Sequence, residues 1–313
     1  MLGYVIRRVL ATVPVMAVVA LFVFSLLYIA PGDPAAVIAG DQATPADVER
    51  IRASLGLDRP FLIRFGEWLW QILHGDLGTS IFTNMPVAAM IAQRAEPTLS
   101  LMLVTLLFAV SVAVPAGVVA AWRAGSMIDR AVMALAVLGF SVPVFVVGYL
   151  VAYVFAVELD WLPVQGYAPL AEGVWPWFET LILPAFALGC VYIALIARFT
   201  RAAMLEVLQQ DYIRTARAKG LGESRLLFVH ALENAAVTIV TVIGLGVAGL
   251  IGGAVVTETV FAIPGIGRLT VDAILRRDYP VIQGIVLLFS LVYVLVNLAV
   301  DLLYTVLDPR IRY

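Results

Sequence analysis

Side chains that could carry out chemistry are few in this sequence and lie far apart. They are His74, His230, the single cysteine Cys190 and the single lysine Lys219. With no second cysteine, Cys190 cannot form a disulfide within the chain, and metal ligation by thiolates is not expected. Lys219 is preceded by Ala218 and followed by Gly220, so it is not part of a phosphate-binding Gly-x-x-x-x-Gly-Lys-Ser/Thr loop. The sequence therefore predicts no catalytic residues and no ATP hydrolysis by this chain.

The stretch DYIRTARAKGLG, residues 211–222, is unusually polar in a chain that is 62% hydrophobic. Asp211 is placed to cap a short helix, and Gly220 and Gly222 are placed to end it. Ile213 and Ala216 would form its narrow apolar side, and the bases would cover the rest, namely Arg214, Arg217 and Lys219. Such a helix faces water or a protein partner and not lipid. A solvated loop helix is the alternative on this pattern alone.

The composition is that of a membrane protein, because only 13% of the residues are charged and the mean hydropathy is +1.00. Six uncharged runs are each long enough to cross a bilayer as a helix. They are residues 9–30, 97–121, 131–157, 180–197, 235–257 and 279–300. The first is too long for the apolar core of a signal peptide, about 7–15 residues. The predicted fold class is an all-α polytopic membrane protein with six transmembrane helices.

The charges of the connecting segments predict which side each one faces. Bases exceed acids in residues 1–8 and 198–234, whereas acids exceed bases in 31–96 and 158–179. The positive-inside rule then places both termini in the cytoplasm. His74 and His230 fall on opposite sides of the membrane, which excludes a metal site or triad that uses both. The predicted location is the cell (inner) membrane of a bacterium or archaeon.

The long segment 31–96 contains signals for two short helices. Thr44 and Pro45 are placed to start the first, and the second is expected to begin at Pro60. The second helix carries a stripe of apolar residues at helical spacing, Phe61, Phe65, Trp68 and Ile72. We interpret it as an amphipathic helix near the lipid surface, which serves either as an aromatic anchor or in contact with a partner. Prolines within the uncharged runs are expected to kink their helices, namely Pro115, Pro143 and Pro184.

Glu258 follows the fifth uncharged run and precedes TVFAIPGIG. Pro264 and Gly265 suit the two central positions of a type II turn. Glu258, Pro264 and Gly265 are candidates for an external gate. The alternative is that Glu258 is an interfacial acid, solvated among headgroups or paired with Arg268.

The sequence beyond the polar stretch, ESRLLFVHALENAAVTIV, leads directly into the fifth run. Its spacing resembles the cytoplasmic signature of permeases of binding-protein-dependent ABC importers: E-A-A, three residues, Gly, nine residues, I-x-L-P. The corresponding positions hold Arg214, Thr215 and Ala216, then Gly220, then His230, Leu232 and Glu233. The residues at most of these positions differ from the signature. The sequence YIRTARAKGL followed by HAL-N is nevertheless similar to that of the dipeptide/oligopeptide branch.

Stretches throughout the chain resemble the same dipeptide/oligopeptide importer branch. They are RRVLATVPV, APGDPA, ETVFAIPGIGRL, RDYPVIQG and NLAVDLLYTVLDPRIR. The resemblance thus extends from end to end, and the long first external segment is similar to that of the first of the two permeases that such importers pair.

The resemblance implies a coupling helix that sits in a cleft of an ATPase subunit. The residues implied in this contact are Tyr212, Arg214, Thr215, Ala216, Arg217, Lys219, Gly220, Leu221 and His230. The implied partners are a second homologous permease, identical or different, two ATP-binding subunits and an extracytoplasmic substrate-binding protein. ATP and Mg would be bound by the ATP-binding subunits, and this chain would hold no cofactor.

The implied architecture is that of a type I importer permease. Residues 1–30 form the N-terminal segment and first span, 31–96 the external loop with short helices, and 97–313 a five-helix core with the coupling helix at about 211–222. The implied cargo is a dipeptide or oligopeptide, or glutathione, a nickel chelate or another small solute.

Two other function classes remain to be weighed. A secondary transporter is the alternative, but we find no internal repeat, and the first five uncharged runs hold no acid, base or histidine to relay protons. A membrane-embedded hydrolase would need a nucleophile and a base within the bilayer, and no uncharged run contains histidine.

Overall fold

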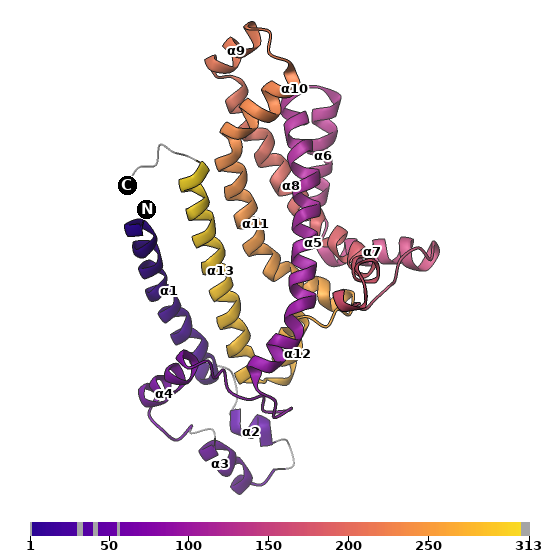
Figure 1. Ribbon diagram of the computed structural model, residues 1–313. Helices are drawn as coiled ribbons and strands as arrows, with labels where there is room; N and C mark the ends of the chain where they lie inside the picture. The colour runs from indigo at the N-terminus through magenta and orange to yellow at the C-terminus, as the bar shows by residue number, and fades with distance from the viewer. Residues whose placement is uncertain (1, 30–33, 40–42, 55–56, 308–313) are drawn as a thin grey trace. The chain divides into compact units, whose positions relative to one another are not determined.

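The computed structural model describes residues 2–29, 34–39, 43–54 and 57–307, which fold into helices joined by loops (Figure 1). Among these residues, five helices are long and apolar enough to cross a membrane. They are α1 (Leu2–Ile29), α5 (Val87–Trp122), α8 (Val174–Leu208), α11 (Leu232–Val260) and α13 (Tyr279–Leu307). A bent pair, α6 (Met127–Ser141) and α7 (Val144–Ala152), makes a sixth span if counted as one. The predicted all-helical, multi-span fold is confirmed.

The third uncharged run is sharply bent at Pro143. Helices α6 and α7 meet there at an angle of 100°. Pro143 has no N–H to continue the helical ladder, and Val142 adopts an extended backbone with φ −92° and ψ 125°. Beyond α7 the chain makes a π-helical turn, η1 (Tyr153–Glu158). The kink expected at Pro143 is therefore found, whereas α5 and α8 continue through Pro115 and Pro184.

The chain packs as two compact units. Unit 1 comprises residues 1–95 and 269–294, and unit 2 comprises 96–268 and 295–313. The sequences of α5, α13 and α12 (Ile266–Arg276) each contribute to both units.

Unit 1 contains the short helices α2 (Pro34–Ala39), α3 (Pro45–Ser54) and α4 (Phe61–Leu73). Helix α3 begins at Pro45, as predicted, and α4 begins at Phe61, one residue after the predicted start at Pro60. The aromatic face of α4 packs on α1, where the rings of Phe65 and Trp68 lie 5.5 and 5.2 Å from that of Phe24. The stripe read from the sequence thus faces α1 and is half-buried.

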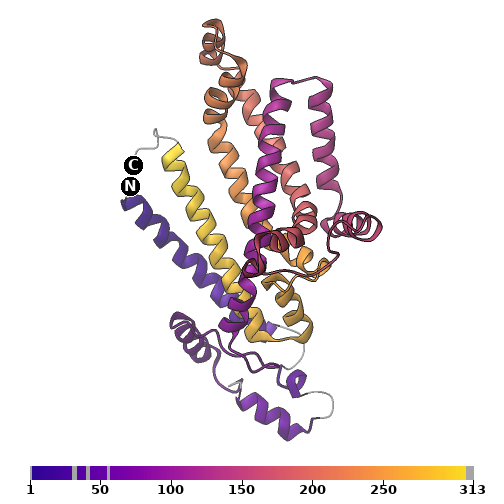
Figure 2. The same ribbon diagram turned by 45° about the vertical axis from the view of Figure 1, so that its right-hand side comes forward.

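Unit 2 is built around α8, which contacts α6, α7 and α11. In both views α5, α6, α8 and α11 run side by side (Figures 1 and 2). At one end of these helices lie α9 (Asp211–Ala218), α10 (Glu223–Arg225) and the π-helical turn η3 (Leu226–Ala231). Toward the other end lie η2 (Leu170–Glu172) and the loop that follows α11. Each end has its own apolar core, one around Met204 and Leu226 and the other around Leu188 and Phe261.

Candidate functional site

Helix α9 is the short polar helix that the sequence predicts. Asp211 is its first helical residue and Gln210 occupies the cap position, so the assignment of Asp211 as the cap is wrong by one residue. In the first turn, the negative charge of Asp211 lies near the positive end of the helix dipole and stabilises the helix. Ile213 is completely buried, whereas Tyr212 is 45% exposed. The basic side chains Arg214, Arg217 and Lys219 are exposed, so α9 presents a cationic surface and is held by its apolar side.

Gly220 ends the turn that follows α9. Its φ of +80° lies in the left-handed region, which residues with a Cβ rarely adopt. The N–H of Gly220 donates to the carbonyl of Arg217 at 3.0 Å, and that of Leu221 donates to Ala216 at 3.3 Å. A Cβ at Gly220 would meet no atom within 4 Å. Glycine is required here by backbone conformation and not by crowding.

Three other elements hold α9 in place. Ile213 packs in a cluster with Val118 of α5, Met204 of α8 and Leu226 of η3. Arg217 donates to the carboxylate of Glu223 at 2.7 and 3.2 Å, and this ion pair raises the pKa of the Arg217 guanidinium. The pair is about half exposed, so the apolar cluster contributes more to anchoring the helix. Any displacement of α9 must therefore involve α5, α8 and η3.

The structure brings the residues of the predicted coupling surface to this end of unit 2. Eight of them lie on α9 and the turn after it: Tyr212, Arg214, Thr215, Ala216, Arg217, Lys219, Gly220 and Leu221. The remaining one, His230, lies on η3, which packs against α9. His230 is half-buried, and its backbone carbonyl accepts a 2.7 Å hydrogen bond from the Asn234 side chain.

A partly buried ion pair between α6 and α8 was not predicted from the sequence. Arg201 of α8 donates through Nε and a terminal nitrogen to the two carboxylate oxygens of Asp129, at 2.5 and 2.8 Å. Asp129 also accepts from the backbone N–H of Gly125 at 2.9 Å, and its own N–H donates to Ser126, which caps α6. We call the Asp129–Arg201 pair the clasp. The Ser126-x-x-Asp129 spacing signals a helix start, but nothing local indicates its partner 72 residues away.

The opposite end of unit 2 contains a buried carboxylate at Glu258. This side chain is fully buried near the end of α11, so the expectation of an acid solvated among headgroups is wrong. It accepts hydrogen bonds from the hydroxyl of Thr98 at 2.6 Å and from the backbone N–H of Arg268 at 2.9 Å. Thr98 in turn accepts from the N–H of Ile266 at 2.8 Å. We call Glu258, Thr98 and these two backbone donors the lock, because they tie α5 and α11 to the start of α12.

The turn between α11 and α12 packs directly on the lock. A Cβ on Gly265 would collide with the carboxylate of Glu258, so the close approach requires glycine. The predicted type II turn is wrong, because the left-handed residue is Ala262, with φ 52°, and not Gly265. The N–H of Gly265 instead donates to Ile263 at 2.9 Å. Pro264 is exposed at the tip of this turn.

A second loop adds to this end of unit 2. The Gly166 N–H donates to the carbonyl of Phe261 at 2.9 Å. The Tyr167 hydroxyl donates to Glu96 at 3.0 Å, and burial is the largest cause that raises the pKa of this hydroxyl. Leu170 donates its N–H to the same Glu96 oxygen at 2.9 Å. The loop and the turn that carries Pro264 are thus hydrogen-bonded to each other and to α5.

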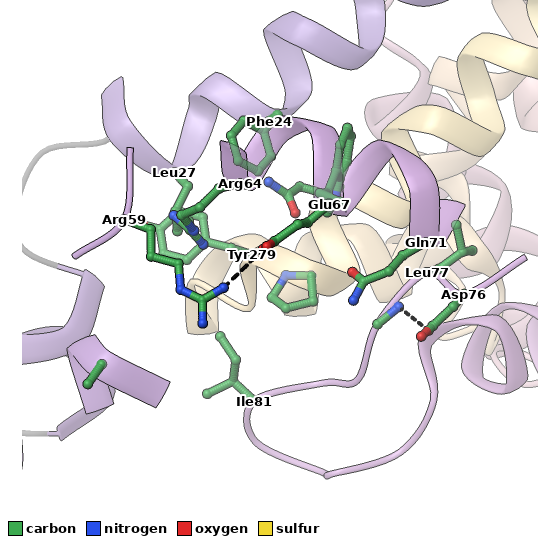
Figure 3. A pocket seen from close by; sticks show the side chains of 15 residues that line it. Phe24, Leu27, Arg59, Arg64, Glu67, Gln71, Asp76, Leu77, Ile81 and Tyr279 are labelled. Atoms are coloured by element: carbon green, nitrogen blue, oxygen red, sulfur yellow. Dashed lines mark hydrogen bonds and ion pairs between the residues drawn. The ribbon is translucent and has the colours of Figure 1, made fainter. Parts of the chain in front are cut away.

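Unit 1 contains a polar cavity of about 410 Å³ (Figure 3). Its lining carries charges of both signs, from Arg59, Arg64, Glu67 and Asp76. Arg59 pairs with Glu67 at 3.2 Å, and the Arg64 guanidinium lies 5.6 Å from the centre of the Phe24 ring. These four charged residues were not singled out from the sequence, because they come from α4 and from the loops before and after it and line one cavity only when this unit folds.

No three His, Cys, Asp or Glu side chains lie close enough to hold a metal ion in the part of the chain that the structure describes. Cys190 is half-buried within α8. His74 follows α4, where its ring contacts that of Trp70 at 4.2 Å between centroids. The described residues instead form an exposed cationic helix, α9, and two sets of hydrogen bonds that position helices, the clasp and the lock.

The fold and the polar helix at its end define the class of protein. The chain is similar to solved structures of the MetNI methionine ABC transporter in inward-facing conformations. One crystal form matches with a TM-score of 0.59 at 19% identity over 70% of this chain and 96% of that chain, and another with 0.58 at 17% identity. The fold is that of a type I ABC importer permease.

Two family profiles match the chain from one end to the other. Residues 1–113 match the N-terminal membrane component of binding-protein-dependent transport systems, and residues 113–313 match the inner membrane component. The chain belongs to this family and is a multi-pass permease subunit of an ABC importer in the cell membrane.

The chain is similar to curated permeases over their full length. A probable peptide ABC transporter permease of Sinorhizobium fredii is 55% identical over 99% of both chains. The glutathione transport system permease GsiC of Pectobacterium atrosepticum is 46% identical, and the dipeptide transport system permease DppB of Alkalihalophilus pseudofirmus is 40% identical, each over 100% of both chains.

Proposed function

We propose that this chain, with a second homologous permease, forms the translocation path for dipeptides or oligopeptides driven by ATP hydrolysis. The observation that carries the proposal is α9, a cationic helix whose polar face is exposed while Ile213 anchors it among three other elements. The peptide cargo is supported by the names of relatives that are 55% and 40% identical over the full chain. Glutathione, itself a small peptide, fits the same class. A nickel chelate or another small solute is the alternative cargo.

In this proposal α9 is the coupling helix and sits in a cleft of an ATP-binding subunit on the cytoplasmic side. An interface that forms and loosens in each cycle is expected to be polar and wet at its rim, as the α9 surface is. A helix that transmits motion must also be fixed to the rest of its own subunit. The buried Ile213 and the turn at Gly220 provide that fixation.

ATP and Mg are bound by two partner subunits in this proposal, since the sequence has no phosphate-binding loop around its one lysine. A substrate-binding protein delivers cargo to the opposite side of the membrane. The complete importer then has two permeases, two ATP-binding subunits and one binding protein.

The lock is the natural candidate for the external gate. Glu258 and Gly265 are buried in contact, and Pro264 is exposed at the tip of the same turn. The Glu258 carboxylate accepts from the Arg268 N–H of α12 and from the Thr98 hydroxyl of α5. To open the gate, the importer would have to break these hydrogen bonds and replace them with others, or move α5, α11 and the start of α12 together.

The test is transport by the purified importer in proteoliposomes, with and without its ATP-binding subunits and binding protein. We expect uptake of labelled dipeptide or oligopeptide only when all components and ATP are present. A binding assay on the partner binding protein would identify the cargo among peptides, glutathione and metal chelates. Uptake by this chain alone, driven by an ion gradient, would overturn the proposal in favour of a secondary transporter.

A further inference from the structure

Helix α6 packs along α8, and the two backbones come close at Gly139, where a Cβ would lie 3.0 Å from the carbonyl oxygen of Cys190. Of its residues Met127–Ser141, only Asp129 and Ala136 are buried. The large apolar side chains Leu135, Val137, Leu138 and Phe140 are each more than half exposed. Asp129 is thus the buried anchor in the first turn of α6, and the clasp to Arg201 fixes that turn on α8 in addition to the packing at Ala136 and Gly139.

The geometry of the clasp is that of a rigid attachment. Both oxygens of Asp129 are bonded by the planar guanidinium of Arg201, and a third bond comes from the Gly125 N–H. The Asp129 side chain is 6% exposed and that of Arg201 is 27% exposed, so solvent screens the pair only in part. A bidentate pair fixes orientation as well as distance. The first turn of α6 thus has a defined place on α8.

Arg201 lies on the part of α8 that also holds α9. One turn further along, Met204 packs in the cluster that buries Ile213. The same α8 segment therefore contacts α9 through apolar packing and α6 through the clasp. By contrast, the Arg217–Glu223 pair is 49% and 40% exposed and joins α9 only to α10.

The other end of α6 leads toward the lock. Beyond the 100° bend at Pro143, α7 packs closely on the end of α11. A Cβ at Gly148 would lie 3.2 Å from the Phe261 ring, three residues from Glu258 in the sequence. Helices α6 and α7 thus form a connection of two straight segments between the α9 end and the lock end of unit 2.

We propose that Asp129 and Arg201 are a positioning pair, through which displacement of α9 and α8 is carried into α6 and onward to the α7 contact beside the lock. This inference rests on the proposed coupling role of α9. Without the clasp, α8 and α9 can move while α6 lags, so ATP hydrolysis continues with less transport.

The experiment uses the complete importer in lipid nanodiscs and proteoliposomes, with hydrolysis and uptake measured on the same preparation. The variants are Asp129→Asn, Arg201→Lys, and the exchanged pair Asp129→Arg with Arg201→Asp. Arg201→Lys keeps the positive charge but cannot form the bidentate hydrogen bond. It replaces Asp129→Asn as the test variant if Asp129→Asn does not assemble. The matched control is Arg130→Gln, an exposed base beside Asp129.

We expect assembled Asp129→Asn and Arg201→Lys importers to hydrolyse ATP in response to the loaded binding protein while solute moved per ATP falls about tenfold, within the range typical of coupling between sites. The exchanged pair should recover part of that ratio, and Arg130→Gln should match the parent. If the pair were only structural, uptake and hydrolysis would fall together with the amount of assembled importer, and solute per ATP would stay at the parental value. That result would overturn the proposal.

A distance measurement gives a second readout. Spin labels at Leu135 of α6 and Phe199 of α8, both exposed, are placed in a Cys190→Ala background because Cys190 is the single cysteine. The distance should stay constant through the nucleotide cycle in the parent and vary in Arg201→Lys. A constant distance in both would overturn the clasp proposal. A coupling-helix variant, Gly220→Val, separates the two proposals. If its uptake and stimulated hydrolysis are also normal, the role of α9 has failed. If both fall while the clasp variants keep the parental solute per ATP, only this inference has failed.

Discussion

The hydroxyl of Thr98 donates a 2.6 Å hydrogen bond to the buried carboxylate of Glu258, joining two residues 160 positions apart. Thr98 is itself 3% exposed and also accepts from the Ile266 N–H. One hydroxyl thus links α5, the end of α11 and the start of α12. Removing it takes one hydrogen bond from the Glu258 carboxylate and one from the Ile266 N–H.

Thr98→Val is therefore expected to lower the free energy of unfolding by about 1–3 kcal/mol, the usual cost of a buried polar group left without its partner. Thermal unfolding of the purified importer in detergent measures this. Thr259→Val is the control. The Thr259 hydroxyl is exposed, and the one hydrogen bond described for it goes to the carbonyl of Val255 in the same helix. Equal midpoints for the two variants would contradict the role of Thr98 in the lock.

Gly265→Ala should disturb the lock through steric contact. Its Cβ would meet the Glu258 carboxylate, which has no room to move because it is fully buried. We expect a lower unfolding temperature together with altered hydrolysis in the absence of binding protein, since the gate would no longer close normally. Gly252→Ala is the matched control, because a Cβ there meets no atom within 4 Å. A normal unfolding temperature and normal hydrolysis in Gly265→Ala would show that this contact is unimportant.

Gly220→Val tests the turn after α9. A β-branched residue at φ +80° costs about 1–2 kcal/mol locally. Such a cost is tolerable for the folded membrane protein but large for a reversible interface, so the variant should insert normally while uptake and substrate-stimulated ATP hydrolysis both fall. Gly222→Val is the control, since Gly222 has φ −62° and open space around it. The two variants should differ clearly in stimulated hydrolysis, and equal activity would contradict the turn's role.

Charge reversal on α9 tests whether its polar face contacts a partner. Arg217→Glu removes an exposed ion pair worth about 0.2–1 kcal/mol, so the fold should survive. Lys219→Glu removes an exposed charge just after the helix. If α9 contacts an ATP-binding subunit, both variants should weaken co-purification and stimulated hydrolysis. A merely solvated loop helix would tolerate each single reversal, because five bases would remain in residues 198–234.

Reporter fusions test the predicted orientation of the chain. Fusions after Arg123 and after Gly222 should report the cytoplasm, and fusions near Asp47 and Glu172 should report the external side. The expectation follows from the excess of bases in residues 198–234 and the excess of acids in 158–179. One fusion on the wrong side would break the predicted topology.

The sequence by itself determined the features that depend on local preferences. Long uncharged stretches must become helices in lipid because backbone groups have no other partners there, and this located the spans. Pro60 marked the start of α4 and Pro143 a break, because proline lacks the N–H that a continuing helix needs. The place of α9 followed from its polarity and from Gly220, whose left-handed backbone is favoured by glycine, but the helix is Asp211–Ala218 and thus ends before the predicted limit at Gly222.

Only the tertiary structure decided where the charged side chains found their partners. Glu258 reads in sequence as an acid at the end of a span, but it is buried because Thr98 and the backbone of Arg268 converge on it. Asp129 reads as a first-turn acid of a helix, and its partner Arg201 is on another span. Burial and pairing depend on which helices pack together, and that is set by contacts between residues far apart in the chain. Local pattern does not contain that information, and for this reason the lock and the clasp emerged only from the folded protein.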